Sequence, residues 1–292
     1  MLGAAWIARR AVIPAIQESR NGRLVALASL RPDAGRAMAS EHAIERIYDA
    51  YERVLDDREV DAVYIPLVNS LHREWTERAL KAGKHVLCEK PIALNAAEAE
   101  AMAATARREQ RLLMEALMYR FHPRMLNFRE AIREPRFVHA AFGFSMTQPD
   151  NYRARPQLGG GALLDVGCYC VDVVRWLLGE PERVSAGAHV EDGVDLTVSA
   201  ALRFPGGAAA TLWGSFESGE RQLLVAVDES GPHVLEQPFT AWRDPYDPYR
   251  LMVEAFADSA LDGSAAPRLL EDSIAGLRVL DAIRRDSGIG GV

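Results

Sequence analysis

Cysteine, long apolar runs and positive charge are all scarce in this sequence. Its 292 residues include only three cysteines, too few for a disulfide scaffold, which agrees with a reducing compartment. No apolar run approaches the roughly 20 residues of a membrane helix, and the first residues lack the pattern of a secretory signal. A formal net charge of -7 excludes a general nucleic-acid or anionic-membrane surface. We therefore expect a cytoplasmic protein without nucleic-acid or membrane partners.

Two of the cysteines, Cys168 and Cys170, are close together in the sequence. A second pair of ligands at zinc spacing is missing. We therefore predict small buried side chains on a helix and no metal site.

The first part of the chain alternates short apolar runs with longer amphipathic ones, which is typical of strand-helix-strand units and a parallel sheet. The predicted strands cover residues 24–29, 62–65, 85–88 and 112–115. The predicted helices cover residues 34–42, 51–55, 70–82 and 96–110. This pattern predicts an α/β Rossmann-like domain over residues 1–121.

From residue 122 onward, longer alternating segments separated by Gly, Pro and Asp turns predict a largely antiparallel sheet. Its expected strands are 138–146, 184–189, 196–204, 208–216 and 222–228, with helices at 162–178, 248–261 and 270–285. Residues 122–292 should form an α+β domain with helices on one face of an open sheet. The uncovered face favours a homodimer or homotetramer formed through that sheet.

The N-terminus has the spacing of a dinucleotide-binding loop, Gly-x-Gly-x-x-Gly/Ala, in the segment that begins at Gly3. We expect Gly3, Ala5, Trp6 and Ile7 to contact a dinucleotide there, although an ordinary helix start is the alternative. Only two residues precede this loop, so the first strand of the domain is expected to be truncated. Either the true start lies upstream or the sheet lacks its middle.

The end of the second predicted strand carries Ser29 and Arg31 where a carboxylate would select NAD. A hydroxyl and a guanidinium suit a 2′-phosphate, because the planar fork of arginine pairs with phosphate oxygens. NADP is therefore favoured over NAD. The alternative is that Arg31 is only a surface residue before a proline.

The next strand ends at Pro66, close to Leu67, Asn69 and His72. Ligands bind at the carboxyl ends of parallel strands. We expect these four residues beside the cofactor ribose or nicotinamide. A helix-capping asparagine and a surface histidine remain alternatives.

The following strand ends in Glu89, Lys90 and Pro91. The proline disfavours helical geometry at Lys90 and so restricts the direction of its side chain. A lysine placed in this way after a buried strand is more than a surface charge, and Glu89 and Lys90 are predicted to border the cofactor.

The strongest predicted helix of the second domain carries Asp165, Tyr169 and Asp172 at a spacing that puts all three on one face. A glycine run at 159–161 precedes it and permits close approach of the backbone. Tyr152 and Arg153, just before the glycines, are predicted to border the substrate.

These segments, in this order and spacing, resemble the Gfo/Idh/MocA oxidoreductases. The resemblance rests on residues 66–72, 83–86 and 89–91, and on a match of 165–172 to the family's Asp-x-Gly-x-His/Tyr-x-x-Asp motif. It implies that Lys90 is catalytic, that the bond to Pro91 is often cis, and that the motif faces the nicotinamide. Tyrosine at 169, with the segment 115–123, resembles the branch that contains glucose-fructose oxidoreductase, dihydrodiol dehydrogenases and NADP-dependent xylose dehydrogenases.

The resemblance implies hydride transfer between a sugar or cyclic diol carbinol and nicotinamide. Tyr169 is the candidate base, because a nearby Lys90 ammonium would lower its usual pKa near 10. Asp165 would orient a neighbouring substrate hydroxyl or the lysine, and Asp172 would contact the substrate. The alternatives are a non-catalytic nucleotide-binding sensor and an NAD-dependent glycosidase. Intact Lys90, Asp165 and Tyr169 disfavour the sensor, and Ser29 with Arg31 disfavours a tightly bound NAD.

Overall fold

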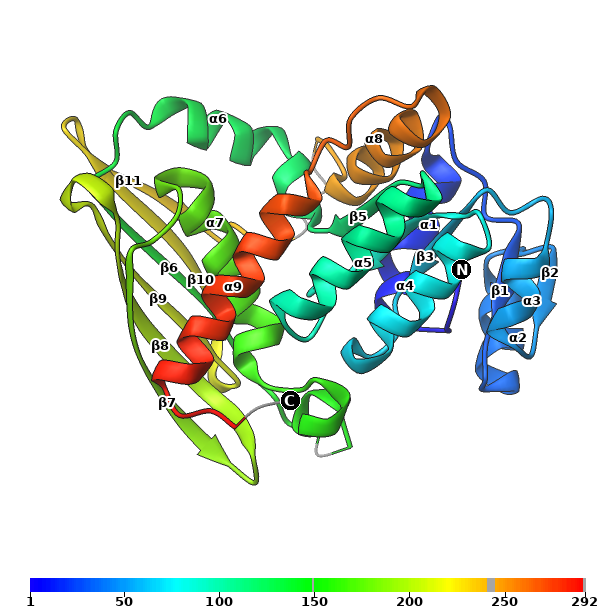
Figure 1. The fold of residues 1–292 in the computed structure, drawn as a ribbon, viewed down its shortest axis with the longest axis horizontal. Coiled ribbons are helices and arrows are strands. Elements are labelled where there is room, and N and C mark those ends of the chain that lie inside the picture. The colour runs from blue at the N-terminus through cyan, green and yellow to red at the C-terminus, as the bar shows by residue number, and fades with distance from the viewer. Residues whose placement is uncertain (149, 241–244, 291–292) are drawn as a thin grey trace. The chain divides into compact units, whose positions relative to one another are not determined.

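The computed structural model describes residues 1–148, 150–240 and 245–290, and its elements are labelled in Figure 1. The chain forms two compact units. The first comprises the described parts of Met1–Ile92, Glu98–His122 and Ala241–Leu270. The second comprises the described parts of Ala93–Ala97, Pro123–Thr240 and Glu271–Val292.

The first unit is a Rossmann-like domain built on parallel strands, which confirms the predicted fold class. Its strands are β1 (Ala26–Ala28), β2 (Arg46–Tyr48), β3 (Ala62–Ile65), β4 (His85–Glu89) and β5 (Leu113–Ala116). Its helices are α1 (Ile13–Glu18), α2 (Pro32–Glu41), α3 (Tyr51–Asp56), α4 (His72–Lys81), α5 (Ala96–Glu109) and α8 (Pro248–Asp262). Strands β1 and β2 pair in parallel, as do β3, β4 and β5 in that order. Strands β3, β4 and β5 are almost wholly buried and mostly apolar, as expected when helices cover both faces of a parallel sheet.

Residues 1–3 lie between β1 and β3. Leu2 forms a parallel bridge with Ala28, and its N–H donates to the Tyr64 carbonyl at 3.0 Å. The Ala28 N–H donates to the Met1 carbonyl at 3.0 Å, and the Gly3 N–H to the Ala28 carbonyl at 2.8 Å. Among the described residues, no named strand lies between β1 and β3, as expected for a truncated first strand, but these three residues supply backbone groups that join the two halves.

Helix α8 belongs to the first unit, whereas the sequence assigned all of 122–292 to one domain. Its buried face includes Tyr249, Met252 and Phe256, and it packs on α1 and on the 3-10 turn Met118–Phe121. Apolar periodicity predicts such a helix, but it does not say which core the apolar face joins.

The second unit is a six-stranded sheet in the order β11-β10-β6-β9-β8-β7. Its strands are β6 (Phe137–Ser145), β7 (Arg183–Glu191), β8 (Val194–Arg203), β9 (Ala209–Ser215), β10 (Glu217–Asp228) and β11 (Gly231–Glu236). Only β6 and β9 pair in parallel, and the other neighbours are antiparallel. The predicted, largely antiparallel sheet is confirmed.

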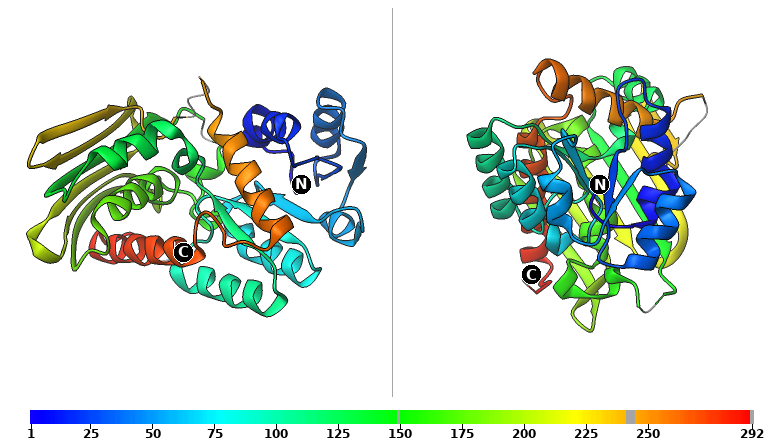
Figure 2. Two further views of the ribbon diagram at one scale, coloured as in Figure 1. Left: turned by 90° about the horizontal axis from the view of Figure 1, so that it is seen from above. Right: turned by 90° about the vertical axis from the view of Figure 1, so that its right-hand side faces the viewer.

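Three helices lie on one side of this sheet, namely α6 (Pro123–Ala131), α7 (Cys168–Leu178) and α9 (Leu270–Asp286) (Figures 1 and 2). Helix α7 packs on β6 and β9. The guanidinium of Arg129 in α6 lies over the Trp176 ring of α7 at 5.2 Å, and Arg175 of α7 donates to the Asp272 carbonyl of α9 at 2.9 Å. No helix among the described residues covers the other face.

Several elements differ from the prediction for identifiable reasons. The helix expected at 162–178 starts as a π-helical segment, Leu163–Gly167, before α7. Strands β2 and β11 were not predicted. Strand β2 has only three residues, and β11 contains Pro232, a residue that is tolerated in edge strands but is not part of the usual strand pattern. Strand β10 begins earlier than expected, because its first residues are polar and include a bulge.

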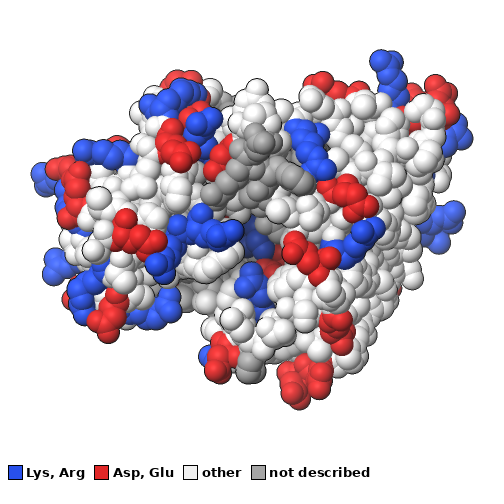
Figure 3. Space-filling view, turned by 180° about the vertical axis from the view of Figure 1, so that it is seen from behind, with Lys and Arg blue, Asp and Glu red and all other residues white. Residues whose placement is uncertain are grey.

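The described residues also show the state of the cysteines and bear on membrane helices, metal sites and surface charge. All three cysteines are free and buried, as predicted for Cys168 and Cys170. In the part of the chain that the structure describes, no helix is long and apolar enough to cross a membrane. No group of three or more His, Cys, Asp or Glu side chains in that part could hold a metal ion. Figure 3 shows basic and acidic side chains interspersed over one face.

Candidate active site

Lys90 directly follows β4, and its backbone N–H is bound by the side chain of Glu89, the last residue of that strand. The Glu89 carboxylate accepts a hydrogen bond from the Tyr64 hydroxyl at 2.6 Å and another from the Lys90 N–H at 3.2 Å. Burial raises the pKa of Glu89, while these two donors and the Lys90 charge act in the opposite direction. The Lys90–Pro91 peptide bond is cis, as the resemblance implies.

A second buried carboxylate holds the other end of this turn. Glu115, in β5, accepts the Ile92 N–H at 3.0 Å and pairs with Arg268 at 3.1 Å. The two side chains are only 6% and 5% exposed. The segment from Glu89 to Ile92, which we call the Lys90 turn, is thus fixed through its own backbone on both sides of the lysine.

The predicted dinucleotide loop begins at Gly3, whose φ of +91° suits glycine. A Cβ there would lie 2.7 Å from the Leu67 side chain. The glycine therefore allows close approach of the protein's own neighbouring loop. Trp6, at the start of the following helical turn, is 71% exposed.

Ser29 and Arg31 lie beside this loop. The Arg31 guanidinium donates to the Ala4 carbonyl at 2.9 Å. The Ser29 hydroxyl, only 3% exposed at residue level, accepts the Arg31 N–H and donates to its carbonyl. The structure therefore brings Arg31 to the Gly3–Ala5 segment, while Ser29 shapes the turn that carries Arg31.

A cavity of about 570 Å³ opens next to Ser29. Two arginines that were not predicted as site residues are among its lining residues. Its lining consists of Ser29, Pro32, Gly35, Arg36, Ile47, Tyr48, Asp49 and Arg53. Arg36 also pairs with Asp33 at 2.6 Å. The periodicity of α2 treats Arg36 as a solvated helix residue, which is why it was missed.

His72 joins the loop after β3 to the Lys90 turn. Its Nδ1 lies 2.8 Å from the Pro91 carbonyl and its Nε2 lies 3.0 Å from the Leu67 carbonyl. Its side chain is fully buried, and this burial lowers its pKa. His72 is therefore not the surface histidine of the alternative, and its place beside the cofactor stays a prediction. Asn69 is also buried, at 2% exposed, while Pro66 and Leu67 are half-buried.

In the second unit, Asp165 lies in the π-helical segment, whereas Tyr169 and Asp172 lie in α7. All three are at most 7% exposed. Single-turn π segments are frequent at functional sites, because they re-aim side chains relative to a regular helix.

Arg153 pairs with Asp165, since its Nε donates to Oδ2 at 2.7 Å. Its guanidinium also lies over the Tyr152 ring, 5.0 Å from the centroid. Burial opposes the charge of Arg153, but the charges of Asp165, Tyr152 and Tyr169 raise its pKa overall. The structure thus brings together four of the residues predicted from the sequence.

An aromatic pair holds the Tyr169 ring. The ring lies 5.5 Å from Phe142 of β6 and 5.4 Å from Phe239, which follows β11. Phe142 and Phe239 stack on each other at 5.5 Å. Neither phenylalanine was predicted as a site residue, because each has the sequence surroundings of an ordinary core residue.

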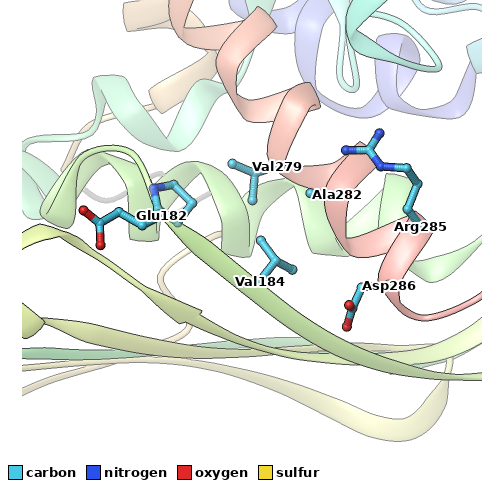
Figure 4. A pocket seen from close by; sticks show the side chains of 7 residues that line it. Glu182, Val184, Val279, Ala282, Arg285 and Asp286 are labelled. Carbon is cyan, nitrogen blue, oxygen red and sulfur yellow. The ribbon is translucent and has the colours of Figure 1, made fainter.

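A second cavity, of about 460 Å³, lies beside the last turn of α9 and the start of β7 (Figure 4). Val184 and Val279 face each other across it. None of the residues predicted to bind or react lines this cavity, so it contributes nothing to the candidate site.

Comparison with known proteins gives a consistent picture. Residues 1–117 match the model described as oxidoreductase family, NAD-binding Rossmann fold, and residues 129–230 match the GFO/IDH/MocA C-terminal domain. D-xylose 1-dehydrogenase (NADP(+)) 2 of Haloferax volcanii is 37% identical over 317 residues, covering 99% of this chain and 97% of that protein.

Solved structures agree with this similarity. The 3-ketoreductase KijD10 from Actinomadura kijaniata, in complex with NADP and TDP-benzene, superposes with a TM-score of 0.92 at 30% identity. The aldose-aldose oxidoreductase from Caulobacter crescentus, complexed with glycerol, also gives 0.92, at 28% identity. Each comparison covers 98% of this chain and 96% of the other.

Proposed function

Because this chain belongs to the GFO/IDH/MocA family of oxidoreductases, we propose that it transfers a hydride between a carbinol carbon of a neutral sugar or cyclic diol and NADP. It is an NAD(P)-dependent oxidoreductase. The Lys90 turn carries the proposal, since two buried carboxylates hold its backbone and so fix the direction of one lysine.

The first unit fits a dinucleotide. Gly3 has the left-handed conformation of a phosphate-binding loop, and a helix follows it, so that its first amides would face the pyrophosphate. Arg31 would hold the 2′-phosphate next to that loop, with Arg36 as a second cation in the neighbouring cavity. When bound, the nicotinamide supplies the hydride acceptor in oxidation and the hydride donor in reduction.

The chain's own groups handle the proton. In oxidation, the Tyr169 Oη takes the proton of the substrate hydroxyl as the carbinol hydride leaves. The Lys90 ammonium would donate a hydrogen bond to a substrate oxygen. The aromatic pair of Phe142 and Phe239 fixes the Tyr169 ring.

The pairing of Arg153 with Asp165 supports a neutral polyhydroxy substrate. Because the carboxylate and the guanidinium compensate each other, the pair presents acceptors and donors to vicinal hydroxyls with little net charge. Tyr152 and Asp172 would border the same substrate. Sugar acids and sugar phosphates are accordingly expected to be poorer substrates than the neutral sugar.

Two further proposals rest on composition and on the sheet. We propose a cytoplasmic location, supported by three free, buried cysteines. We also propose a homodimer or homotetramer through the uncovered face of the six-stranded sheet, where Val234 is 56% exposed.

The direct test is turnover with NADP+ and with NAD+ on a panel of aldoses and cyclic trans-diols. We expect NADP+ to be reduced faster. The Lys90→Met variant should lose turnover while retaining NADPH binding measured by fluorescence. Lys81→Met, at a surface lysine 54% exposed, should match the wild type. Tight NADPH binding without turnover on any member of the panel would favour the sensor and overturn the proposal.

The cofactor preference has its own test. Arg31→Ala should raise KM for NADP+ by about tenfold, because the 2′-phosphate contact is lost. KM for NAD+ should rise much less, since that cofactor is affected only through the lost bond to the Ala4 carbonyl. Arg23→Ala, an exposed arginine paired with Glu45, serves as the control. Equal losses for both cofactors would refute the role of Arg31 as a 2′-phosphate ligand.

A further inference from the structure

Asp195, near the start of β8, lies at the N-terminus of the helix that carries Asp165 and Tyr169. Its side-chain Oδ2 accepts the Leu163 N–H at 2.6 Å, and the carboxylate also receives the Ala162 N–H. Asp195 is 6% exposed. It therefore acts as a buried cap, supplied from a distant strand, for the otherwise unsatisfied amides of the first helical turn.

The glycine run before the helix leaves the space that the Asp195 carboxylate occupies. Gly161 has φ +107°, and a Cβ there would lie 2.0 Å from Oδ1 of Asp195. A Cβ on Gly160 would lie 2.4 Å from the Arg153 carbonyl. These glycines therefore allow the chain to wrap around the carboxylate and around the backbone of Arg153, rather than around a ligand alone.

The cap controls both members of the Arg153–Asp165 pair. Gly161 donates its N–H to the Arg153 carbonyl at 2.9 Å, which fixes the backbone that carries the guanidinium. Leu163 opens the π-helical segment that carries Asp165. Displacing the cap would therefore shift the two partners relative to each other and, through the same helix, relative to Tyr169.

The charge of the Asp195 carboxylate changes within the pH range of an ordinary assay. Burial raises its pKa to about 6, against the amide donors of Leu163 and Ala162 and the positive charge of Arg284 in α9. At neutral pH the carboxylate is mostly charged and accepts both amides. Below about pH 6 it takes up a proton and loses one acceptor and its interaction with the helix dipole.

We propose that Asp195 is a positioning residue for the reaction: by capping the helix that carries Asp165 and Tyr169, it holds them and Arg153 in the arrangement that turnover requires. The inference rests on the proposed function for its kinetic consequence. Its structural consequence, an ordered start of this helix, does not depend on any substrate.

The experiment compares Asp195→Asn with Asp247→Asn. Asp247 also caps a helix, since it accepts the Tyr249 N–H of α8 at 2.9 Å, but it is the residue directly before that helix and lies in the first unit. The Asn variant keeps the size of Asp195 and one acceptor oxygen, so it should fold. We expect kcat to fall by at least about tenfold in Asp195→Asn, with NADPH affinity within about twofold of the wild type.

The pH profile separates positioning from a purely structural role. Wild-type kcat should fall as the pH drops through about 6, and this step should be missing in Asp195→Asn. Asp247→Asn should retain wild-type kcat and the wild-type profile. If both variants keep wild-type kcat and profile, the inference is overturned.

Hydrogen exchange provides a readout without turnover. Peptides covering residues 159–169 should exchange faster in Asp195→Asn than in the wild type, and Asp247→Asn should leave them unchanged. Unchanged exchange in Asp195→Asn would overturn the inference. A wild-type protein inert on every polyol would overturn the proposed function instead, while the exchange data would still test the cap.

Discussion

Replacing Arg268 with Met tests whether the buried carboxylate under the Lys90 turn depends on its cation. Arg268 and Glu115 are 5% and 6% exposed, with their nitrogen and oxygen 3.1 Å apart. Removing one partner of a buried pair leaves an uncompensated charge and costs about 3–5 kcal/mol. Glu115 would keep the Ile92 N–H, worth about 1 kcal/mol. We therefore expect a loss near the lower end, about 3 kcal/mol in the free energy of unfolding.

Urea unfolding of four proteins measures this loss. The double variant Glu115→Gln with Arg268→Met should recover a large part of it, because no buried charge remains unpaired. As a control, Arg73→Met removes an exposed helical pair with Glu77 and should cost under about 0.5 kcal/mol. A loss below about 1 kcal/mol for Arg268→Met, or a double variant no more stable than it, would refute the reasoning.

Three further outcomes are expected. Burial lowers the pKa of His72, so acidification protonates this histidine in the unfolded state before it does so in the folded state. The free energy of unfolding should therefore fall more between about pH 7 and pH 5 in the wild type than in His72→Leu, which urea midpoints would measure. Gly263→Ala, at a left-handed position with open space, should cost about 1 kcal/mol. Gly161→Ala should cost about 3 kcal/mol, because it also collides with a buried carboxylate, and equal thermal shifts would contradict this. The Arg133 N–H and other donors lower the pKa of Asp228, so the deficit in melting temperature of Asp228→Asn should be full near neutral pH and shrink as the pH falls below about 4, whereas a pH-independent deficit would argue against the assignment.

Local signals in the sequence were enough to predict the segments that are proposed to react. A buried aliphatic strand that ends in Lys90 before a proline identified the turn, and the spacing of Asp165, Tyr169 and Asp172 identified the helix. Both signals depend only on the period of an element and on the residue at its end, which neighbours in sequence determine.

The supports of these segments could not be found in the same way. Arg268 is 153 residues from Glu115, and Asp195 is 32 residues from Leu163. Each looks like an ordinary charged residue in the sequence, because only the fold brings Arg268 to the Glu115 carboxylate and Asp195 to the Leu163 N–H. The assignment of α8 to the first unit was missed for the same reason.

The buried carboxylates at the Lys90 turn and at the start of the helix meet the same physical requirement. Strand ends and helix starts leave backbone N–H groups without partners, and burying such groups unpaired is costly. At the Lys90 turn the donors are Lys90 and Ile92, and at the helix start Leu163 is the donor; in each case a buried carboxylate accepts them. A carboxylate serves here better than an amide, because it accepts more than one N–H and its charge favours the donors. The groups proposed to react are therefore held through their backbones by residues that need not touch the substrate, and substitutions at these supports should affect turnover more than binding.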